Sequence, residues 1–232
     1  LMIVGTLILN PTKQNIISLG KGKFDFILLD FQHSAFTWET ADYVIETVYT
    51  YTDKKIWIRV ANNNFSDINR AYDIGADAVV VPLINTMNDL KNCINAARYK
   101  PLGNRSWGPV RLRENYQSYE DYFINAHSKQ FLFPQIESLQ GLNNLSEMCT
   151  LDGWDGVMIG PSDLAISMGE VPNFPPKSQL VKDKMEEIIN ICKSKNKIPG
   201  LFAGSLDVAK EFVSKGAECF TYGSDLELLD EG

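Results

Sequence analysis

Phe24-Asp25-Phe26-Ile27-Leu28-Leu29-Asp30 is an almost continuous apolar run that ends in an acid and is followed by Phe31-Gln32-His33. Strands buried on both faces of a parallel sheet form runs of this kind, whereas a strand with one wet face alternates apolar and polar residues. The run therefore predicts a strand inside a parallel sheet. Because polar residues follow it directly, we expect functional groups where this strand ends.

Seven more runs of the same type occur along the chain, at residues 4–9, 56–60, 78–82, 130–136, 156–160, 198–203 and 218–222. Helical patterns lie between most of them, at residues 37–50, 66–74, 87–99, 139–149, 179–195 and 206–215. Strands that alternate with helices in this way predict an α/β protein with a (β/α)8 TIM barrel. A doubly wound open sheet is the alternative, but Asn10-Pro11-Thr12 after the first run is not the Gly-rich loop expected there.

The composition limits the class of protein. The chain has 232 residues, of which 44% are hydrophobic, so we expect one barrel domain over residues 1–232 with a large core. A net charge of −7 argues against a nucleic-acid partner. No apolar run reaches the roughly 18 residues of a membrane span, and four scattered cysteines without a CxxC pair indicate reduced thiols. We therefore expect a cytoplasmic protein with no membrane or nucleic-acid partner.

Polar residues gather where several predicted strands end. They are Asp30, Gln32, His33, Arg59, Gln135, Glu137, Ser162 and Asp163. The active site of a barrel lies at the carboxyl ends of its strands, so these side chains are expected to converge. Glu137 and Asp163 are predicted to hold a divalent cation, because Mg²⁺ takes oxygen ligands and often only one or two carboxylates. The alternative for each acid is that it caps the helix that follows.

Two other side chains suit proton transfer and anion binding. His33 can move a proton near neutral pH if a carboxylate orients it, and Asp30 and Asp73 are the candidates. The alternative is a purely structural histidine. Arg59 needs an anionic partner, which is either a structural carboxylate or a substrate carboxylate or enolate. Residues 101–122, rich in Gly, Pro and Arg, form either an active-site loop or an oligomer contact.

The chain resembles the metal-dependent (class II) 2-oxo acid aldolases of the HpcH/HpaI group over nearly its whole length. The resemblance is carried by residues 24–33, 58–60, 72–76, 80–82, 97–99, 101–105, 135–137 and 156–164. It implies a barrel of the phosphoenolpyruvate/pyruvate-binding type. It also implies reversible cleavage of a 4-hydroxy-2-oxo acid to pyruvate and an aldehyde through a metal-stabilised enolate. The implied cofactor is Mg²⁺, or else Mn²⁺ or Co²⁺, and the implied assembly is a homo-oligomer, a hexamer or trimer of dimers.

The same resemblance implies roles for single residues. Glu137 and Asp163 match the metal ligands, and Asp163 also borders the substrate. Arg59 matches the pyruvate-binding arginine. His33 matches the catalytic histidine, and Asp73 matches the aspartate paired with it. The pocket positions are matched by Gln135, near the metal, and by Ser162, whose backbone helps to hold the pyruvate carboxylate.

The chain departs from the family pattern at three places. Gln32 stands where the family usually has Glu, so one negative charge near the metal is missing. Ala61 and Asn62 follow Arg59 in place of Pro and Trp, which leaves the aldehyde specificity open. The chain ends where the family continues into a last helix, so we expect that helix to be missing.

Two other functions remain open. One is a barrel that binds a 2-oxo acid with weakened catalysis, which the neutral Gln32 favours. The other is a related lyase acting on a coenzyme A thioester. That activity requires a basic groove for the nucleotide phosphates, and the candidates for it are Arg98, Arg105, Arg111 and Arg113.

Overall fold

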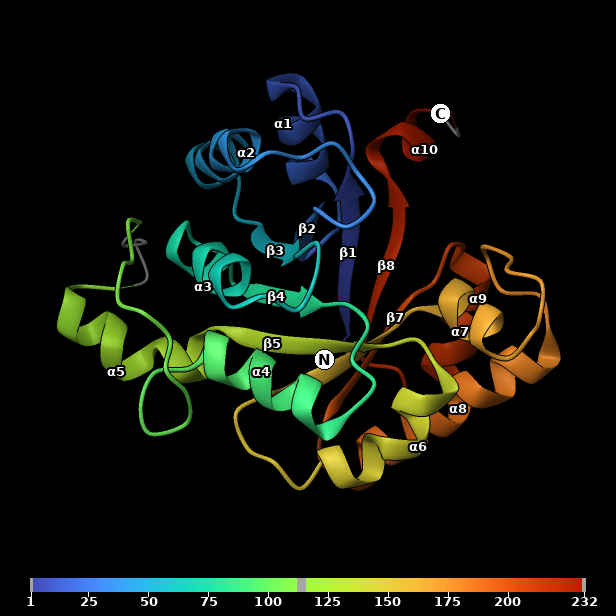
Figure 1. The fold of residues 1–232 in the computed structure, drawn as a ribbon. Coiled ribbons are helices and arrows are strands. Elements are labelled where there is room, and N and C mark those ends of the chain that lie inside the picture. The colour runs from blue at the N-terminus through green and yellow to red at the C-terminus, as the bar shows by residue number, and fades with distance from the viewer. Residues whose placement is uncertain (1, 112–115, 231–232) are drawn as a thin grey trace.

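The structure is a computed structural model that describes residues 2–111 and 116–230. Eight parallel strands close into a barrel in the order in which they occur in the sequence, and β8 pairs with β1. The helices surround the strands (Figure 1). The predicted (β/α)8 barrel is therefore confirmed, and the open doubly wound sheet is wrong.

The strands are β1 (Ile3–Ile8), β2 (Phe26–Asp30), β3 (Lys55–Arg59), β4 (Ala78–Val81), β5 (Phe131–Ile136), β6 (Gly156–Ile159), β7 (Ile198–Phe202) and β8 (Cys219–Ser224). The helices are α1 (Lys13–Lys21), α2 (Trp38–Tyr51), α3 (Phe65–Asp73), α4 (Met87–Ala97), α5 (Tyr119–Lys129), α6 (Leu139–Met148), α7 (Pro161–Ser167), α8 (Gln179–Ser194), α9 (Leu206–Ser214) and α10 (Asp225–Asp230). Each predicted strand is present with small shifts at its ends. α1 and α5 were not predicted.

Side chains in the strand-to-helix loops determine where the helices begin. Thr86 and Asp89 form a capping box at the start of α4, and Ser138 accepts a hydrogen bond from the third residue of α6. Such caps satisfy the free N–H groups of the first helical turn. Because each cap closely follows a strand, it also determines how far the strand end extends over the barrel.

Aromatic rings fill the part of the barrel interior that lies toward the amino ends of the strands. Phe26 stacks on Trp57 with ring centroids 3.9 Å apart, and Trp57 stacks on Phe133 at 4.7 Å. Gly5 of β1 makes room for them, because a Cβ there would lie 2.2 Å from the Phe26 ring. The interior is thus a packed core, as in other barrels, and open space remains only at the strand ends.

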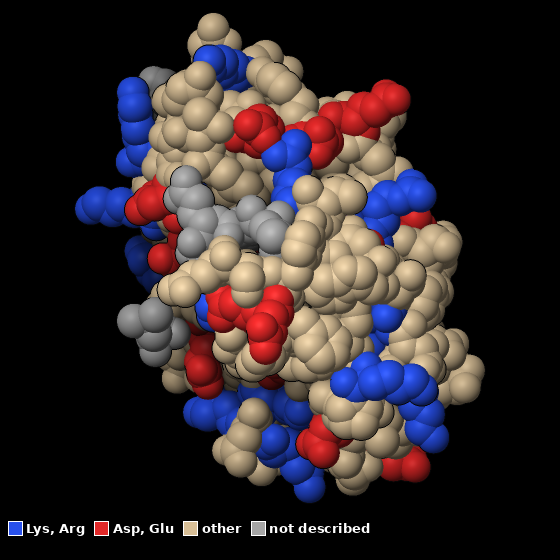
Figure 2. Space-filling view, turned by 90° about the vertical axis from the view of Figure 1, so that its left-hand side faces the viewer, with Lys and Arg blue, Asp and Glu red and all other residues tan. Residues whose placement is uncertain are grey.

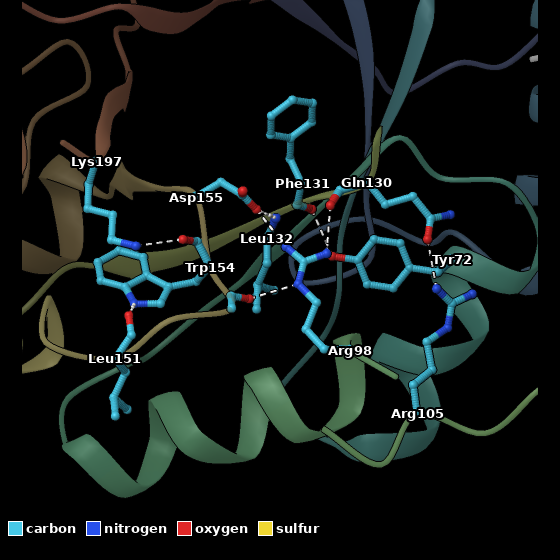
Figure 3. A network of polar contacts seen from close by, with 11 residues as sticks. Tyr72, Arg98, Arg105, Gln130, Phe131, Leu132, Leu151, Trp154, Asp155 and Lys197 are labelled. Carbon is cyan, nitrogen blue, oxygen red and sulfur yellow. Dashed lines mark hydrogen bonds and ion pairs between the residues drawn. The ribbon is translucent and has the colours of Figure 1, made fainter. Parts of the chain in front are cut away.

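Arg98 is the C-terminal cap residue of α4, and its side chain bonds to residues that come just before β5 and β6 (Figure 3). It is 2% exposed and donates to the carbonyl oxygens of Gly153 and Gln130 and to the Asp155 carboxylate, at 2.6–2.8 Å. Asp155 also accepts from the Leu132 N–H at 2.7 Å. This network fastens α4 to the residues that precede β5 and β6.

The described residues of the segment 101–122, which are 101–111 and 116–122, lie on the outside of the barrel. Arg111 pairs with Asp42 and Glu46 of α2, and Trp107 packs against Tyr99. Within a single chain, the described residues of this segment do not line the cavity at the carboxyl end of the barrel. The predicted active-site loop is therefore not found at this cavity in a single chain. Residues 112–115 lie outside the described part. On the face that carries α2, α3 and α5, acidic and basic side chains are interspersed (Figure 2).

The ends of the barrel and the cysteines complete the fold. α10 follows β8 near the C-terminus (Figure 1). The expectation that the family's last helix is missing stays a prediction. All four cysteines are unpaired and three are buried, as predicted. Among the described helices, none has both the length and the apolar character that a membrane crossing requires.

Replacing Arg98 with alanine is expected to lower the free energy of unfolding by about 3–5 kcal/mol, because it removes the cationic partner of Asp155 and the Arg98 donors of the Gly153 and Gln130 carbonyl groups. Arg111→Ala is the matched control. It removes an ion pair with half-exposed acids, and we expect a loss of at most about 1 kcal/mol. Urea unfolding of both variants measures the difference. Equal losses would mean that the Arg98 network does not stabilise the barrel.

Candidate active site

A cavity of about 290 Å³ lies at the carboxyl end of the barrel. Five of the predicted site residues line it, namely His33, Arg59, Gln135, Ser162 and Asp163. A larger cavity of about 480 Å³ lies at the opposite end and is lined by the first residues of strands, such as Ile3, Lys55 and Phe131. None of the predicted site residues lines this second cavity. The carboxyl-end cavity is therefore the candidate site, as expected for this fold.

Glu137 follows β5 and is 2% exposed. Its carboxylate accepts from the Leu83 N–H at 2.7 Å and from the side-chain amide of Gln135. Burial raises the pKa of the Glu137 carboxyl above its ordinary value, and the nearby Asp163 carboxylate adds to the rise, while the two hydrogen bonds oppose it. Glu137 is thus a desolvated acid next to a second acid. It does not cap α6, because Ser138 does.

Leu83 presents its N–H to Glu137 from an unusual backbone conformation. Its φ is +59°, in the left-handed region that non-glycine residues seldom adopt. The sequence analysis missed this residue, because nothing in the pattern that follows β4 indicates a left-handed leucine.

Asp163 lies in the first turn of α7, which begins at Pro161 with Gly160 as its cap residue. The alternative that Asp163 caps this helix is therefore wrong. Gly160 allows a close approach of the β6 end to Glu137, because a Cβ there would lie 2.6 Å from a Glu137 carboxylate oxygen. Glu137 and Asp163 therefore belong to one corner of the barrel, at the adjacent ends of β5 and β6.

This corner has the donors that a hard divalent cation requires. Gln135 is 1% exposed and lines the cavity, and its amide oxygen is buried without a hydrogen-bond partner among the described residues. The described part of the chain contains no cluster of three or more His, Cys, Asp or Glu residues that could form a closed metal cage. Two carboxylates with an amide oxygen beside them suit Mg²⁺, which keeps water and substrate oxygens among its ligands.

Arg59 ends β3 and is held by Asp30 from the end of β2. Its Nε and Nη2 donate to the two Asp30 carboxylate oxygens at 2.8 and 2.6 Å, and both side chains are buried. The guanidinium lies over the Phe202 ring at 4.7 Å. Arg59 therefore has the structural carboxylate partner that was one of its two predicted alternatives. Its Nη1 is not used by Asp30, and the side chain still lines the cavity.

His33 and Asp73 are not brought together within one chain. His33 is exposed and lines the cavity, whereas Asp73 ends α3 on the outside of the barrel. The Asp73 carboxylate accepts from Arg105 at 2.8 Å and from Asn69 at 2.6 Å, and burial raises its pKa despite these bonds. Asp30, the other candidate partner of His33, is bonded to Arg59. The catalytic pair of His33 and Asp73 stays a prediction.

One wall of the cavity was missed by the sequence analysis. It comes from the ends of β1, β7 and β8 and from the loop after α7, and it consists of Leu7, Leu9, Phe174, Phe202 and Glu227. The rule that located the acids, which collects strand-end residues, would have found part of it. It was applied to polar side chains at four strand ends and not to apolar ones.

The fold and the cavity define a (β/α)8 enzyme that acts on a small molecule at the carboxyl ends of its strands. Residues 10–231 match the HpcH/HpaI aldolase/citrate lyase family. The chain belongs to this family, as the sequence analysis predicted.

Curated and solved relatives agree with this assignment. The 4-hydroxy-2-oxo-heptane-1,7-dioate aldolase of Salmonella dublin is 29% identical over 210 residues, which are 90% of this chain and 79% of the relative. The predicted carbon–carbon lyase of the aldolase type agrees with this name and with the family.

Two solved structures are similar in fold. The HpcH/HpaI aldolase from Desulfitobacterium hafniense DCB-2 has a TM-score of 0.88 at 19% identity and covers 99% of this chain and 89% of its own. The citrate lyase beta subunit of M. tuberculosis, complexed with oxaloacetate and magnesium, has a TM-score of 0.61 at 10% identity, with 96% and 91% covered.

Glu137→Gln is expected to stabilise the metal-free protein. The raised pKa of Glu137 means that its contribution to stability is lost as the pH rises through that pKa, so at neutral pH the ionised form opposes folding. We expect a gain of about 0.5–2 kcal/mol, seen as a rise in Tm of about 2–4 °C for each kcal/mol. Added Mg²⁺ or Mn²⁺ should raise the Tm of the parent but not of the variant.

The control for this change is Glu147→Gln, which alters an exposed glutamate on α6 and should leave both the Tm and the metal response unchanged. Thermal unfolding with and without metal measures all three proteins. A Glu137→Gln variant that keeps the full metal response would remove Glu137 from the metal site.

Proposed function

We propose that this chain is a divalent-metal-dependent aldolase that reversibly cleaves a 4-hydroxy-2-oxo acid to pyruvate and an aldehyde. The proposal rests on one observation. At the ends of β5 and β6, the buried Glu137, the Asp163 of α7 and the unpartnered amide oxygen of Gln135 meet beside a cavity that Arg59 and His33 also line. Two acids that form no ion pair with the described residues, next to an unpartnered acceptor and an arginine, favour a site for a metal ion and an anionic substrate.

The cation, with Mg²⁺ as the first candidate and Mn²⁺ or Co²⁺ as alternatives, would be held by Glu137 and Asp163 and would supply a Lewis acid for the charge that develops on the 2-oxo group. A structural relative in complex with oxaloacetate and magnesium is a precedent for a 2-oxo acid and a metal in this type of barrel. Arg59 directs Nη1, which Asp30 leaves free, to the same oxygen of the substrate. The backbone of Ser162, in the first turn of α7, faces the substrate carboxylate.

His33 takes the proton of the C4 hydroxyl group in the cleavage direction. The bond between C3 and C4 then breaks, the aldehyde leaves, and the electron pair moves to the 2-oxo group to form the enolate of pyruvate. A donor hydrogen bond from Arg59 is strongest when this oxygen carries negative charge, which is what transition-state stabilisation requires. Protonation at C3 completes the reaction.

The assembly is part of the proposal. Within one chain Asp73 is occupied by Arg105 and lies outside the barrel, so it can orient His33 only if a second copy of the chain brings it there. We therefore propose a homo-oligomer, in line with the hexameric arrangement implied by the resemblance. The four unpaired cysteines suit a reducing compartment such as the cytoplasm.

The coenzyme A alternative is not favoured by the described arginines. Arg98 and Arg105 are buried and donate to groups within the fold, and Arg111 pairs with two acids of α2. Arg113 lies outside the described residues.

The second alternative is a barrel with weakened catalysis, and the relevant residue for it is Gln32. Its amide oxygen is a buried acceptor without a described partner, so the residue keeps a capacity for hydrogen bonding without the charge of Glu.

Asp163→Asn should weaken metal binding and pyruvate release together, because it removes one of two anionic ligands from the proposed site. The assay measures pyruvate formed from a panel of 4-hydroxy-2-oxo acids after chelation and after return of Mg²⁺, Mn²⁺ or Co²⁺. Asp152→Asn changes an exposed aspartate that precedes β6, and it serves as the matched control with unchanged activity. Full activity of Asp163→Asn, or of the chelated parent, would contradict the metal-dependent mechanism.

Arg59→Lys should lower kcat on the order of 10²–10³-fold, the usual cost of losing a donor to a developing oxyanion, although the charge is retained. The planar guanidinium of arginine can donate to both Asp30 oxygens and to the substrate at the same time, whereas the single ammonium group of lysine cannot. Arg70→Lys on the outer surface of α3 is the control and should not change kcat. A decrease of less than about tenfold for Arg59→Lys would indicate a purely structural role for Arg59.

A further inference from the structure

The cavity has two chemically different sides. The acids and amides lie at the ends of β5 and β6, together with the first turn of α7. The other side is built from the ends of β7, β8 and β1, which are neighbours in the closed barrel. On this second side Leu7, Leu9, Phe174 and Phe202 line the cavity. If the 2-oxo acid half of the substrate binds at the acids, the half that leaves as the aldehyde lies against this apolar side.

Phe174 is held in place on this side although it is 54% exposed. Its ring packs on the backbone of Gly204, where a Cβ would lie 3.0 Å from the ring. Gly204 has a φ of +69°, so both its conformation and the contact with Phe174 favour the absence of a side chain. Leu9 at the end of β1 is 40% exposed. Phe174 and Leu9 thus form an apolar surface at the mouth of the cavity.

The charge on this side is negative. Glu227 of α10 lines the cavity, and its carboxylate accepts from the Ser224 hydroxyl at 3.1 Å, while the Ser224 oxygen accepts from the Glu227 N–H at 3.3 Å. This reciprocal pair holds the acid over the end of β8. Among the described lining residues, the side chains that can carry positive charge are Arg59 and His33. Arg59 is already neutralised by the buried Asp30.

We infer that the aldehyde partner is uncharged and apolar and that Glu227 disfavours a substrate with a second carboxylate. This inference rests on the proposed function and names its substrate class. A carboxylate placed on the second side would meet Leu9, Phe174 and the Glu227 anion, and no cation among the described residues of the same chain lines that side, so its lost hydration would be uncompensated within the chain. The relative from Salmonella dublin is named for a 1,7-dioate, which carries such a second carboxylate.

The size of the cavity agrees with a small partner. At about 290 Å³ it is at or below the lower end of small-molecule sites, which are about 300–1,000 Å³, and it must hold both halves of the substrate. A short alkyl aldehyde fits this space and buries its apolar surface against Phe174 and Leu9.

Two substrates that differ only at one end test the inference. They are 4-hydroxy-2-oxoheptanoate, which yields pyruvate and butanal, and 4-hydroxy-2-oxoheptane-1,7-dioate, which yields pyruvate and succinic semialdehyde. For the parent protein with Mg²⁺ or Mn²⁺, we expect kcat/KM for the methyl-ended substrate to exceed that for the dioate by about tenfold or more, which corresponds to about 1.4 kcal/mol.

Two variants assign the preference to residues. Glu227→Gln removes the anion, and Leu9→Lys adds a cation to the apolar surface. Each should reduce the preference for the methyl-ended substrate by about fivefold or more, since each removes or offsets a like-charge repulsion in a partly desolvated site. Glu39→Gln, an exposed glutamate at the start of α2 that does not line the cavity, is the control and should leave the ratio unchanged.

The outcomes separate the inference from the function on which it rests. A parent that prefers the dioate overturns the inference and leaves the aldolase proposal intact. A parent that prefers the methyl-ended substrate, with the same ratio in Glu227→Gln and Leu9→Lys, overturns the assignment of the preference to this side of the cavity. No pyruvate from either substrate with any of the metals overturns the proposed function itself.

Discussion

The Glu137 carboxylate is removed from water at the end of β5, and two described donors, the Leu83 N–H and the Gln135 amide, compensate for that loss in part. The neighbouring Asp163 carboxylate works against the charged form of Glu137, and the positive charge of Arg59 favours that form only weakly. Arg59 forms its ion pair with Asp30, which binds its guanidinium through two hydrogen bonds. The arrangement is costly in the protein alone, and a stability cost of this kind is common in functional sites.

The rest of the barrel holds these groups in position. The stack of Phe26, Trp57 and Phe133 fills part of the barrel interior. Trp57 and Phe133 also line the cavity at the amino end, and the candidate site is the separate cavity at the carboxyl end. Arg98 joins the residues before β5 and β6, the same two strands that carry the acids at their opposite ends. Groups placed at the ends of packed strands are positioned more precisely than groups on loops. Rigidity at the amino end of the barrel thus supports chemistry at the carboxyl end.

Much of this was predictable from sequence because each inference needed only local information. Buried parallel strands form apolar runs, and the polar residue that follows such a run must lie at one end of the barrel, which placed Glu137 and His33 correctly at that end. The partner of a side chain depends on distant residues, so neither the bond between Asp30 and Arg59 nor the outward position of Asp73 followed from the pattern. α5 was missed because its first turn lies within residues 101–122, which were interpreted as one loop.

Leu83 contributes a backbone N–H to the site, and its side chain takes no part in this hydrogen bond. Its left-handed backbone directs an N–H at Glu137, while its own side chain is 53% exposed. The hydrogen bond itself places no demand on the side chain at this position, whereas the left-handed backbone excludes β-branched residues there. A one-residue insertion or deletion in this turn would direct the N–H away from Glu137. In this barrel, the length of the turn between β4 and α4 therefore determines the environment of Glu137, although no side chain of the turn is needed for it.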